Sequence, residues 1–118
     1  DWMVGYDYSR RVLPRTHPHY RGEPDPADEP RSAYCQQIPR KFHPHSVNKQ
    51  WRAVVTRDGW KYVIQPGHDW LMHNLNEDPY EQINLAHDRV FDERRKELRA
   101  LLGEWICSTG DDFELPPD

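Results

Sequence analysis

The sequence of 118 residues lacks a long hydrophobic run, a large cluster of basic residues and any paired cysteine motif. A membrane-spanning helix needs about 18 or more consecutive apolar residues, so no membrane span is predicted. The formal net charge is −4 and basic residues occur only in twos and threes, which argues against a nucleic-acid partner, because that binding depends on clustered Lys and Arg. Cys35 and Cys107 belong to no CxxC pair, so neither a disulfide framework nor a cysteine-rich zinc site is predicted.

Motifs for nucleophilic catalysis and phosphate binding are also missing from the sequence. No serine elbow of the GxSxG kind is present, and the glycines are scattered singly, so no glycine-rich phosphate loop is predicted. Cys35 does not begin a Cys-x-Pro-x-Arg signature, because the next proline and arginine come too late, at Pro39 and Arg40. Two pairs of acids are interpreted as turn and helix-end residues rather than as general acid/base pairs: Glu77-Asp78 and Asp111-Asp112.

Proline dominates the first half of the chain. Residues 1–50 hold seven of the eleven prolines, and residues 14–30 contain almost nothing apolar, which predicts a long extended loop. Such a loop lacks the hydrophobic side chains needed to offset its ordering entropy, so we expect it to pack on protein outside this sequence. The first residues, "DWMVGYDYSRR", show neither an initiator Met nor a signal-peptide pattern, and we expect further polypeptide to precede them.

Strand patterns begin after this loop. Ser32 to Pro39 is a candidate strand, and "WRAVVTRDGWKYVI" predicts a hairpin, because two β-rich runs flank a short connection that ends in glycine. Alternation places Arg52, Val54 and Thr56 on one face of the first hairpin strand and the residues between them on the other. After the turn "QPGHD", residues 70–75 supply a further strand.

A connector and a helix complete the predicted fold. In "LNEDPYEQINLA", Asp78 can bond backbone amides, Tyr80 can fold back over the sheet edge and Asn84 can cap a turn, so an ordered corner is predicted. From the N-cap Asp88 to the terminator Gly110, an amphipathic helix is indicated by an apolar stripe: Phe91, Leu98, Leu101, Leu102 and Trp105. The predicted class is α+β, a small antiparallel sheet of about four strands packed against one C-terminal helix.

Three segments in this order resemble a known family: "WRAVVTRDGWKYV", a strand ending in "NLNEDPYEQINLA", and the helix with Leu101 and Trp105. Residues 51–118 resemble the C-terminal subdomain of type I, formylglycine-dependent sulfatases of the alkaline phosphatase superfamily. In residues 1–50, "VGYDYSRRVLP" is similar to the segment that closes the large sulfatase domain, and one strand follows it. The chain departs from the family in carrying His73 and Asn74 where an aromatic and an acid are common.

The resemblance implies hydrolysis of a sulfate ester, or of a phosphonate or phosphate monoester as in close relatives. The formylglycine nucleophile and the ligands of a divalent cation, which we expect to be calcium, would lie in a catalytic domain outside this chain. That domain is the implied partner, and the chain alone is expected to be inactive. By the same resemblance His43, His45 and Arg52 are candidates for contacting the substrate or its sulfate, while ordinary loop and ion-pair roles remain open for each.

A second hypothesis is a free-standing α+β binding or assembly module. It is motivated by His17-Pro18-His19 and His43-Pro44-His45, because residues i and i+2 of an extended segment point the same way and could offer two imidazoles to one metal ion. No carboxylate at ligand spacing accompanies either pair, which favours ordinary loop histidines. A sulfatase subdomain, unlike a free module, should expose a large apolar face.

Overall fold

The computed structural model describes residues 12–20, 22, 29–37 and 49–117. The chain divides into two compact units, residues 1–31 and 32–118. The described part of the first unit forms two successive turns, in which the amide of His17 donates to the Pro14 carbonyl (2.9 Å) and that of Tyr20 to the His17 carbonyl (2.9 Å). This part is therefore turned rather than extended as predicted, because Pro18 has the backbone angle that the second residue of a turn requires.

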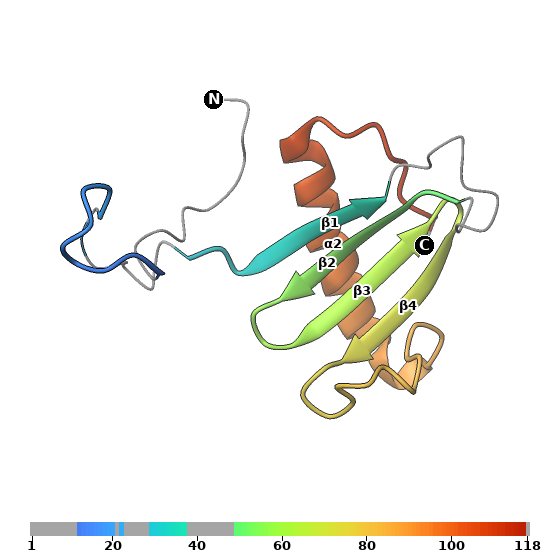
Figure 1. The fold of residues 1–118 in the computed structure, drawn as a ribbon. Helices are drawn as coiled ribbons and strands as arrows, with labels where there is room; N and C mark the ends of the chain where they lie inside the picture. Colours follow the sequence, from blue (N-terminus) through green and yellow to red (C-terminus); the bar gives the residue numbers. More distant parts are fainter. Residues whose placement is uncertain (1–11, 21, 23–28, 38–48, 118) are drawn as a thin grey trace. The chain divides into compact units, whose positions relative to one another are not determined.

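The second unit is an antiparallel sheet with one long helix. Strands β1 (Ser32–Gln37), β2 (Trp51–Thr56), β3 (Trp60–Gln65) and β4 (His68–Asn74) lie in the order β1-β2-β3-β4. A 3₁₀ helix, η2 (Arg89–Phe91), leads into helix α2 (Asp92–Thr109). Figure 1 shows α2 crossing one face of the sheet, which leaves the other face toward the viewer. The predicted α+β arrangement is confirmed.

Glycine fixes both turns around β3. Gly59 has φ +85°, and a side chain there would meet the Asn76 side chain at 2.6 Å, so the hairpin turn accepts only glycine. Gly67 has φ +84° and follows Pro66, which makes a two-residue turn. Strand β4 therefore begins at His68, two residues earlier than the sequence predicted. A bulge between Val63 and Ile64 then shifts the register of the β3–β4 pairing.

Helix α2 covers the core that the sequence pattern outlined. Asp88 caps η2 by accepting from the Val90 amide (3.0 Å), so α2 itself begins only at Asp92. The helix ends where Gly110 adopts φ +66°. Of the predicted stripe, Leu98 and Leu102 are buried in the core, while Phe91, Leu101 and Trp105 are half-buried and pack against it. The buried members of the core are Val54, Tyr62, Ile64, Met72, Ala86, Leu98, Leu102, Ile106 and Phe113. No helix among the described residues is long and apolar enough to cross a membrane.

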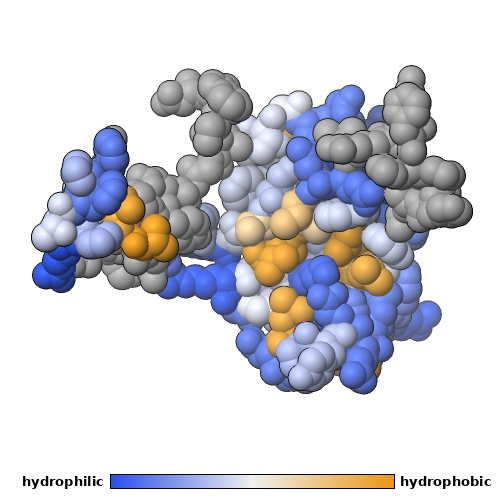
Figure 2. Space-filling model, viewed as in Figure 1, coloured by the Kyte–Doolittle hydropathy of each residue, from blue (hydrophilic) through white to orange (hydrophobic). Residues whose placement is uncertain are grey.

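The sheet has a second face, here called the outer face, that α2 does not cover. Since Val54 lies in the core, its neighbours Ala53 and Val55 point to the outer face, as the alternation predicted. Strand register aligns further outer-face residues with these two: Ala33, Cys35, Lys61, Val63, Leu71 and His73. Figure 2 shows hydrophobic side chains across the middle of this face with polar residues around them.

The segment from Asn76 to Ala86 forms the ordered corner that the sequence predicted. The Asn84 carbonyl oxygen accepts from the Met72 and Ala86 amides, both at 3.0 Å, while its amide group donates to the Trp70 carbonyl at 2.9 Å. One side chain thus ties the corner to strand β4 and positions Ala86 in the core. The amide of Ile83 donates to the Asp78 carboxylate at 2.8 Å, and such amide bonds hold the pKa of Asp78 below its usual range.

The corner also contacts the outer face. His73 Nδ1 donates to the Ile83 carbonyl at 3.0 Å, and Lys61 Nζ contacts the Glu81 carboxylate at 2.7 Å. Glu81 has φ +54°, a left-handed conformation that these contacts stabilise. The side chain of Tyr80 is 82% exposed, so the prediction that it folds back over the sheet edge is wrong. The bonds of Asp78 and His73 hold the backbone in place and leave Tyr80 no role in ordering the corner.

We predict that Asn84→Ala lowers the free energy of unfolding by about 2 kcal/mol, because it removes three hydrogen bonds and leaves backbone groups of β4 and the corner unsatisfied. Urea denaturation measures the change. The matched control is Gln82→Ala, which alters an exposed side chain in the same corner. Equal stability of the two variants would show that Asn84 does not hold the corner.

Candidate functional site

Three side chains join the end of the chain to the sheet, and we call them the latch: Tyr34, Arg52 and Asp111. The left-handed Gly110 turns the chain at the end of α2, so that Asp111 faces β1 and β2. Arg52 donates through Nε and Nη2 to the two carboxylate oxygens of Asp111, the second bond being 2.9 Å long. The Tyr34 hydroxyl donates to the same carboxylate. A bidentate guanidinium–carboxylate pair of this kind fixes orientation as well as position.

Arg52 is a buried charge whose contacts lie within the chain. It is only 3% exposed, and its Nη1 donates to the Trp51 carbonyl at 3.1 Å and the Gln37 carbonyl at 3.3 Å. Its guanidinium also stacks over the Phe113 ring, 4.7 Å from the ring centre. These contacts explain how a strand can bury a charge beside Val54, because each side of the guanidinium meets a carboxylate, a carbonyl or an aromatic face.

The latch shifts the pKa values of its members in opposite directions. Hydrogen bonding from Arg52, opposed by burial and helped by Tyr34, lowers the pKa of Asp111 to about 2. The hydrogen bond to Asp111 in turn raises the pKa of Arg52. Burial, together with the Asp111 carboxylate, raises the pKa of Tyr34 well above its usual value. Asp111 is therefore a permanent anion and Tyr34 a permanent donor at neutral pH, which makes the latch unsuited to proton transfer.

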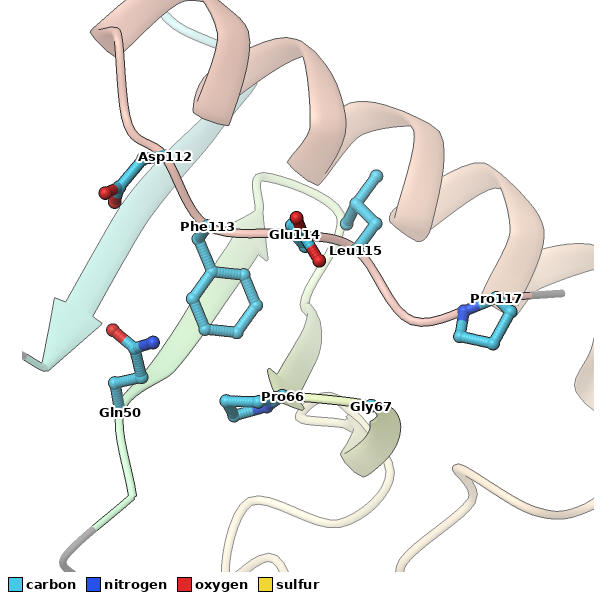
Figure 3. A pocket seen from close by; sticks show the side chains of 8 residues that line it. All are labelled: Gln50, Pro66, Gly67, Asp112, Phe113, Glu114, Leu115 and Pro117. Atoms are coloured by element: carbon cyan, nitrogen blue, oxygen red, sulfur yellow. The ribbon is translucent and has the colours of Figure 1, made fainter.

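After the latch, residues 112–117 run beside the sheet end and form one wall of a hollow of about 410 Å³, which we call the tail pocket. Figure 3 shows the Phe113 ring directed from this segment toward Gln50 and Pro66 on the opposite side. Leu115 packs on α2, where its Cδ1 lies 3.1 Å from the position of a Cβ at Gly103. The lining residues are Gln50, Pro66, Gly67, Asp112, Phe113, Glu114, Leu115 and Pro117.

A second hollow, of about 330 Å³, lies over the latch itself and is called the latch hollow. It shares Gln50 and Asp112 with the tail pocket and is also lined by Arg52 and Asp111. The remaining lining residues are Gln36, Thr109 and Gly110. Both hollows thus open at the end of the sheet where β1 stops and β2 begins. Sequence reasoning identified neither, because both depend on where the latch directs residues 111–117.

The predicted substrate residues differ in what the structure describes. His43 and His45 lie outside the described residues, in the connection between Gln37 and Trp51. Arg52 lies inside them, in the wall of the latch hollow and paired with Asp111. One sequence signal pointed to this pairing: a charge on the same strand face as Val54 needs a buried partner, although the pattern does not indicate which acid.

One of the two histidine pairs lies within the described residues. His17 and His19 have ring centres 5.5 Å apart, and His17 Nδ1 accepts from the His19 amide at 3.2 Å, which uses one of the two ring nitrogens. Within the described ranges no group of three or more His, Cys, Asp or Glu side chains could hold a metal ion. The pair His43 and His45 lies outside those ranges.

We predict that Asp111→Ala lowers the free energy of unfolding by about 3 kcal/mol, because the variant leaves the buried charge of Arg52 without its carboxylate. The control is Asp112→Ala, a change at the next residue, which is exposed. Chemical denaturation compares the two. A loss no larger than that of Asp112→Ala would contradict the stabilising role of the latch.

Acid should weaken the latch in a defined pH window. Because the pKa of Asp111 falls from an unfolded value near 3.8 to about 2, its contribution is complete above pH 4 and disappears as pH falls to 2. The contribution is about 2 kcal/mol. Stability curves of the wild type and Asp111→Asn should therefore converge between pH 4 and pH 2. Curves that stay parallel through this window would show that Asp111 does not titrate as described.

Comparison with known proteins finds similar solved structures but no matching family model or curated sequence. The structure of BT4656 in complex with its substrate D-glucosamine-2-N,6-O-disulfate aligns with a TM-score of 0.61 and 27% identity over 74% of this chain. The crystal structure of a sulfatase candidate from Bacteroides thetaiotaomicron aligns with a TM-score of 0.63 and 24% identity over 86% of this chain.

The aligned region is a small part of each of these proteins. This chain covers 17% of the length of the first and 22% of the length of the second. In both, the likeness extends over most of this chain. The sheet, the corner and the C-terminal helix of this chain therefore make up a sulfatase-like fold.

Proposed function

We propose that the chain is the C-terminal subdomain of a sulfatase-type hydrolase that cleaves sulfate esters. The main observation behind this proposal is that the chain aligns with about a fifth of each of two solved structures at TM-scores of 0.61 and 0.63. The order of hairpin, strand, corner and helix along residues 51–109 supports the same assignment. A relative that cleaves phosphonate or phosphate monoesters would share this architecture.

The chemistry is assigned to protein outside this chain. The described residues offer no group that could hold a divalent cation, and the latch carboxylate is already committed to Arg52. We therefore place the formylglycine nucleophile and the cation, expected to be calcium, in a catalytic domain that this chain completes. The role left to the chain is to form the wall of the substrate pocket.

The wall is assigned to the sheet end that carries the two hollows. His43 and His45 lie in the connection that leaves β1 and enters β2 at this end, and we propose that they contact the substrate or its sulfate. Arg52 follows this connection, as the second residue of β2, and lies in the wall of the latch hollow. The guanidinium of Arg52 already binds the Asp111 carboxylate, which neutralises its charge. Arg52 would therefore contact the substrate as one member of an ion pair.

The outer face is assigned to the interface with the catalytic domain. At its centre Ala53 and Val63 are 2% and 3% exposed. The accessible apolar groups around them are Ala33, Cys35, Val55 and Leu71. Apolar groups on the sheet face opposite α2 support the proposal that another domain covers this face and excludes water from it. The alternative, a free-standing module, does not explain why these apolar groups are accessible.

Sulfate-ester hydrolysis by the polypeptide extended toward its N-terminus tests the proposal. We predict that the extended polypeptide contains Cys/Ser-x-Pro-x-Arg and cleaves an aryl sulfate with calcium present, while the 118-residue chain does not. In the active form, His43→Ala and His45→Ala should each raise KM about tenfold, which corresponds to the loss of one charge-assisted hydrogen bond. His17→Ala is the matched control and should leave KM unchanged.

Turnover by the 118-residue chain alone would overturn the proposal that the nucleophile and the cation lie in a separate catalytic domain. An extended polypeptide without activity toward sulfate, phosphonate and phosphate esters would overturn the hydrolase assignment. Zinc binding that depends on His17 or His43 would instead support the metal-linked assembly module.

A further inference from the structure

We propose that the tail pocket binds a sugar unit of the substrate that carries hydroxyl or ammonium groups, and that it rejects a unit bearing sulfate. The proposal rests on the proposed sulfatase function, which makes a sulfated saccharide a natural substrate class. It assigns a site that the predicted residues His43, His45 and Arg52 do not include.

The shape and floor of the tail pocket suit one sugar ring. Its volume of about 410 Å³ lies within the range of small-molecule sites in proteins. The exposed ring of Pro66 supplies apolar surface on one side, and the Phe113 ring on the other side, which is 6% exposed, adds a small area. The C–H face of a sugar ring can pack on such surfaces. The Gln50 amide, on the side that Phe113 faces, can both donate to and accept from hydroxyl groups.

The phenyl ring that forms this floor is held rigidly. Phe113 belongs to the core, its amide donates to the Asp111 carboxylate at 3.2 Å, and the Arg52 guanidinium lies over its ring. The next anchor is Pro116, whose carbonyl accepts from Arg99 Nη1 at 3.2 Å. The segment between these anchors is therefore pre-positioned, so binding a ligand there costs little ordering of the protein.

The charge of the tail pocket selects against sulfate. The described residues that line it include two acids, Asp112 and Glu114, and no Lys, Arg or His. In the neighbouring latch hollow, Arg52 is the one cation among the described lining residues, and Asp111 neutralises it. Among the described lining residues a sulfate would meet carboxylates without a compensating cation, whereas an ammonium group would be attracted. Repulsion of the wrong group is a recognised source of binding specificity.

NMR titration of the ¹⁵N-labelled 118-residue chain tests the proposal. The probes are glucosamine, methyl glucoside and glucose 6-sulfate, which present an ammonium group, hydroxyl groups alone and a sulfate on similar rings. Glucosamine and methyl glucoside should shift the amide signals of Gly67, Phe113 and Leu115, and glucose 6-sulfate should not. The double variant Asp112→Asn/Glu114→Gln should raise the Kd of glucosamine about fivefold, as expected for two partly screened charges.

The control is Glu77→Gln/Glu104→Gln, which removes two exposed acids outside the tail pocket and should leave the Kd of glucosamine unchanged. The proposal is overturned if glucose 6-sulfate shifts the same signals, if neither uncharged nor amino sugar shifts them, or if the control changes the Kd as much as the double variant. The titration requires no turnover. A failed sulfatase assay with intact sugar binding would therefore contradict the proposed function alone, and the reverse result would contradict this site alone.

Discussion

The pairing of Arg52 with Asp111 is the interaction on which this end of the molecule depends. A guanidinium that is 3% exposed on a sheet face shared with Val54 requires a carboxylate, and the chain supplies one only after α2 has ended and Gly110 has turned it back. The pairing therefore fixes the direction of every later residue. It brings the Phe113 ring into the core and under the guanidinium, and it positions Asp112, which lines both hollows.

Local patterns predicted the fold where one signal dominated. The sequence predicted the hairpin, the corner and the helix correctly. Their signals are a glycine turn, an amide side chain that bonds backbone groups and an apolar stripe, and each of these acts within a few residues. The start of β4 was misplaced because a Pro66-Gly67 turn needs only two residues, and Tyr80 was misplaced because polar bonds already order the corner. The latch could not be predicted, because Arg52 and Asp111 are 59 residues apart and no local rule pairs them.

The two faces of the sheet have different proposed roles. The inner face and α2 form a core that the chain builds for itself, whereas the outer face offers apolar groups with polar surroundings, as a surface for another domain would. The sheet end between them carries the connection with His43 and His45, together with the tail pocket and the latch hollow. Under the proposed function, the catalytic domain supplies charge and nucleophile, and this end supplies shape and selectivity for the rest of the substrate.

The coupling energy between Arg52 and Asp111 tests the central claim most directly. In a double-mutant cycle, the unfolding free energies of the wild type, Arg52→Met, Asp111→Ala and the double variant are compared by urea denaturation. A pair that jointly determines the course of residues 111–117 should show a coupling of about 2 kcal/mol, with the double variant more stable than the sum of the single losses implies. Additive losses, with a coupling below about 0.5 kcal/mol, would contradict the claim that the two residues act as one unit.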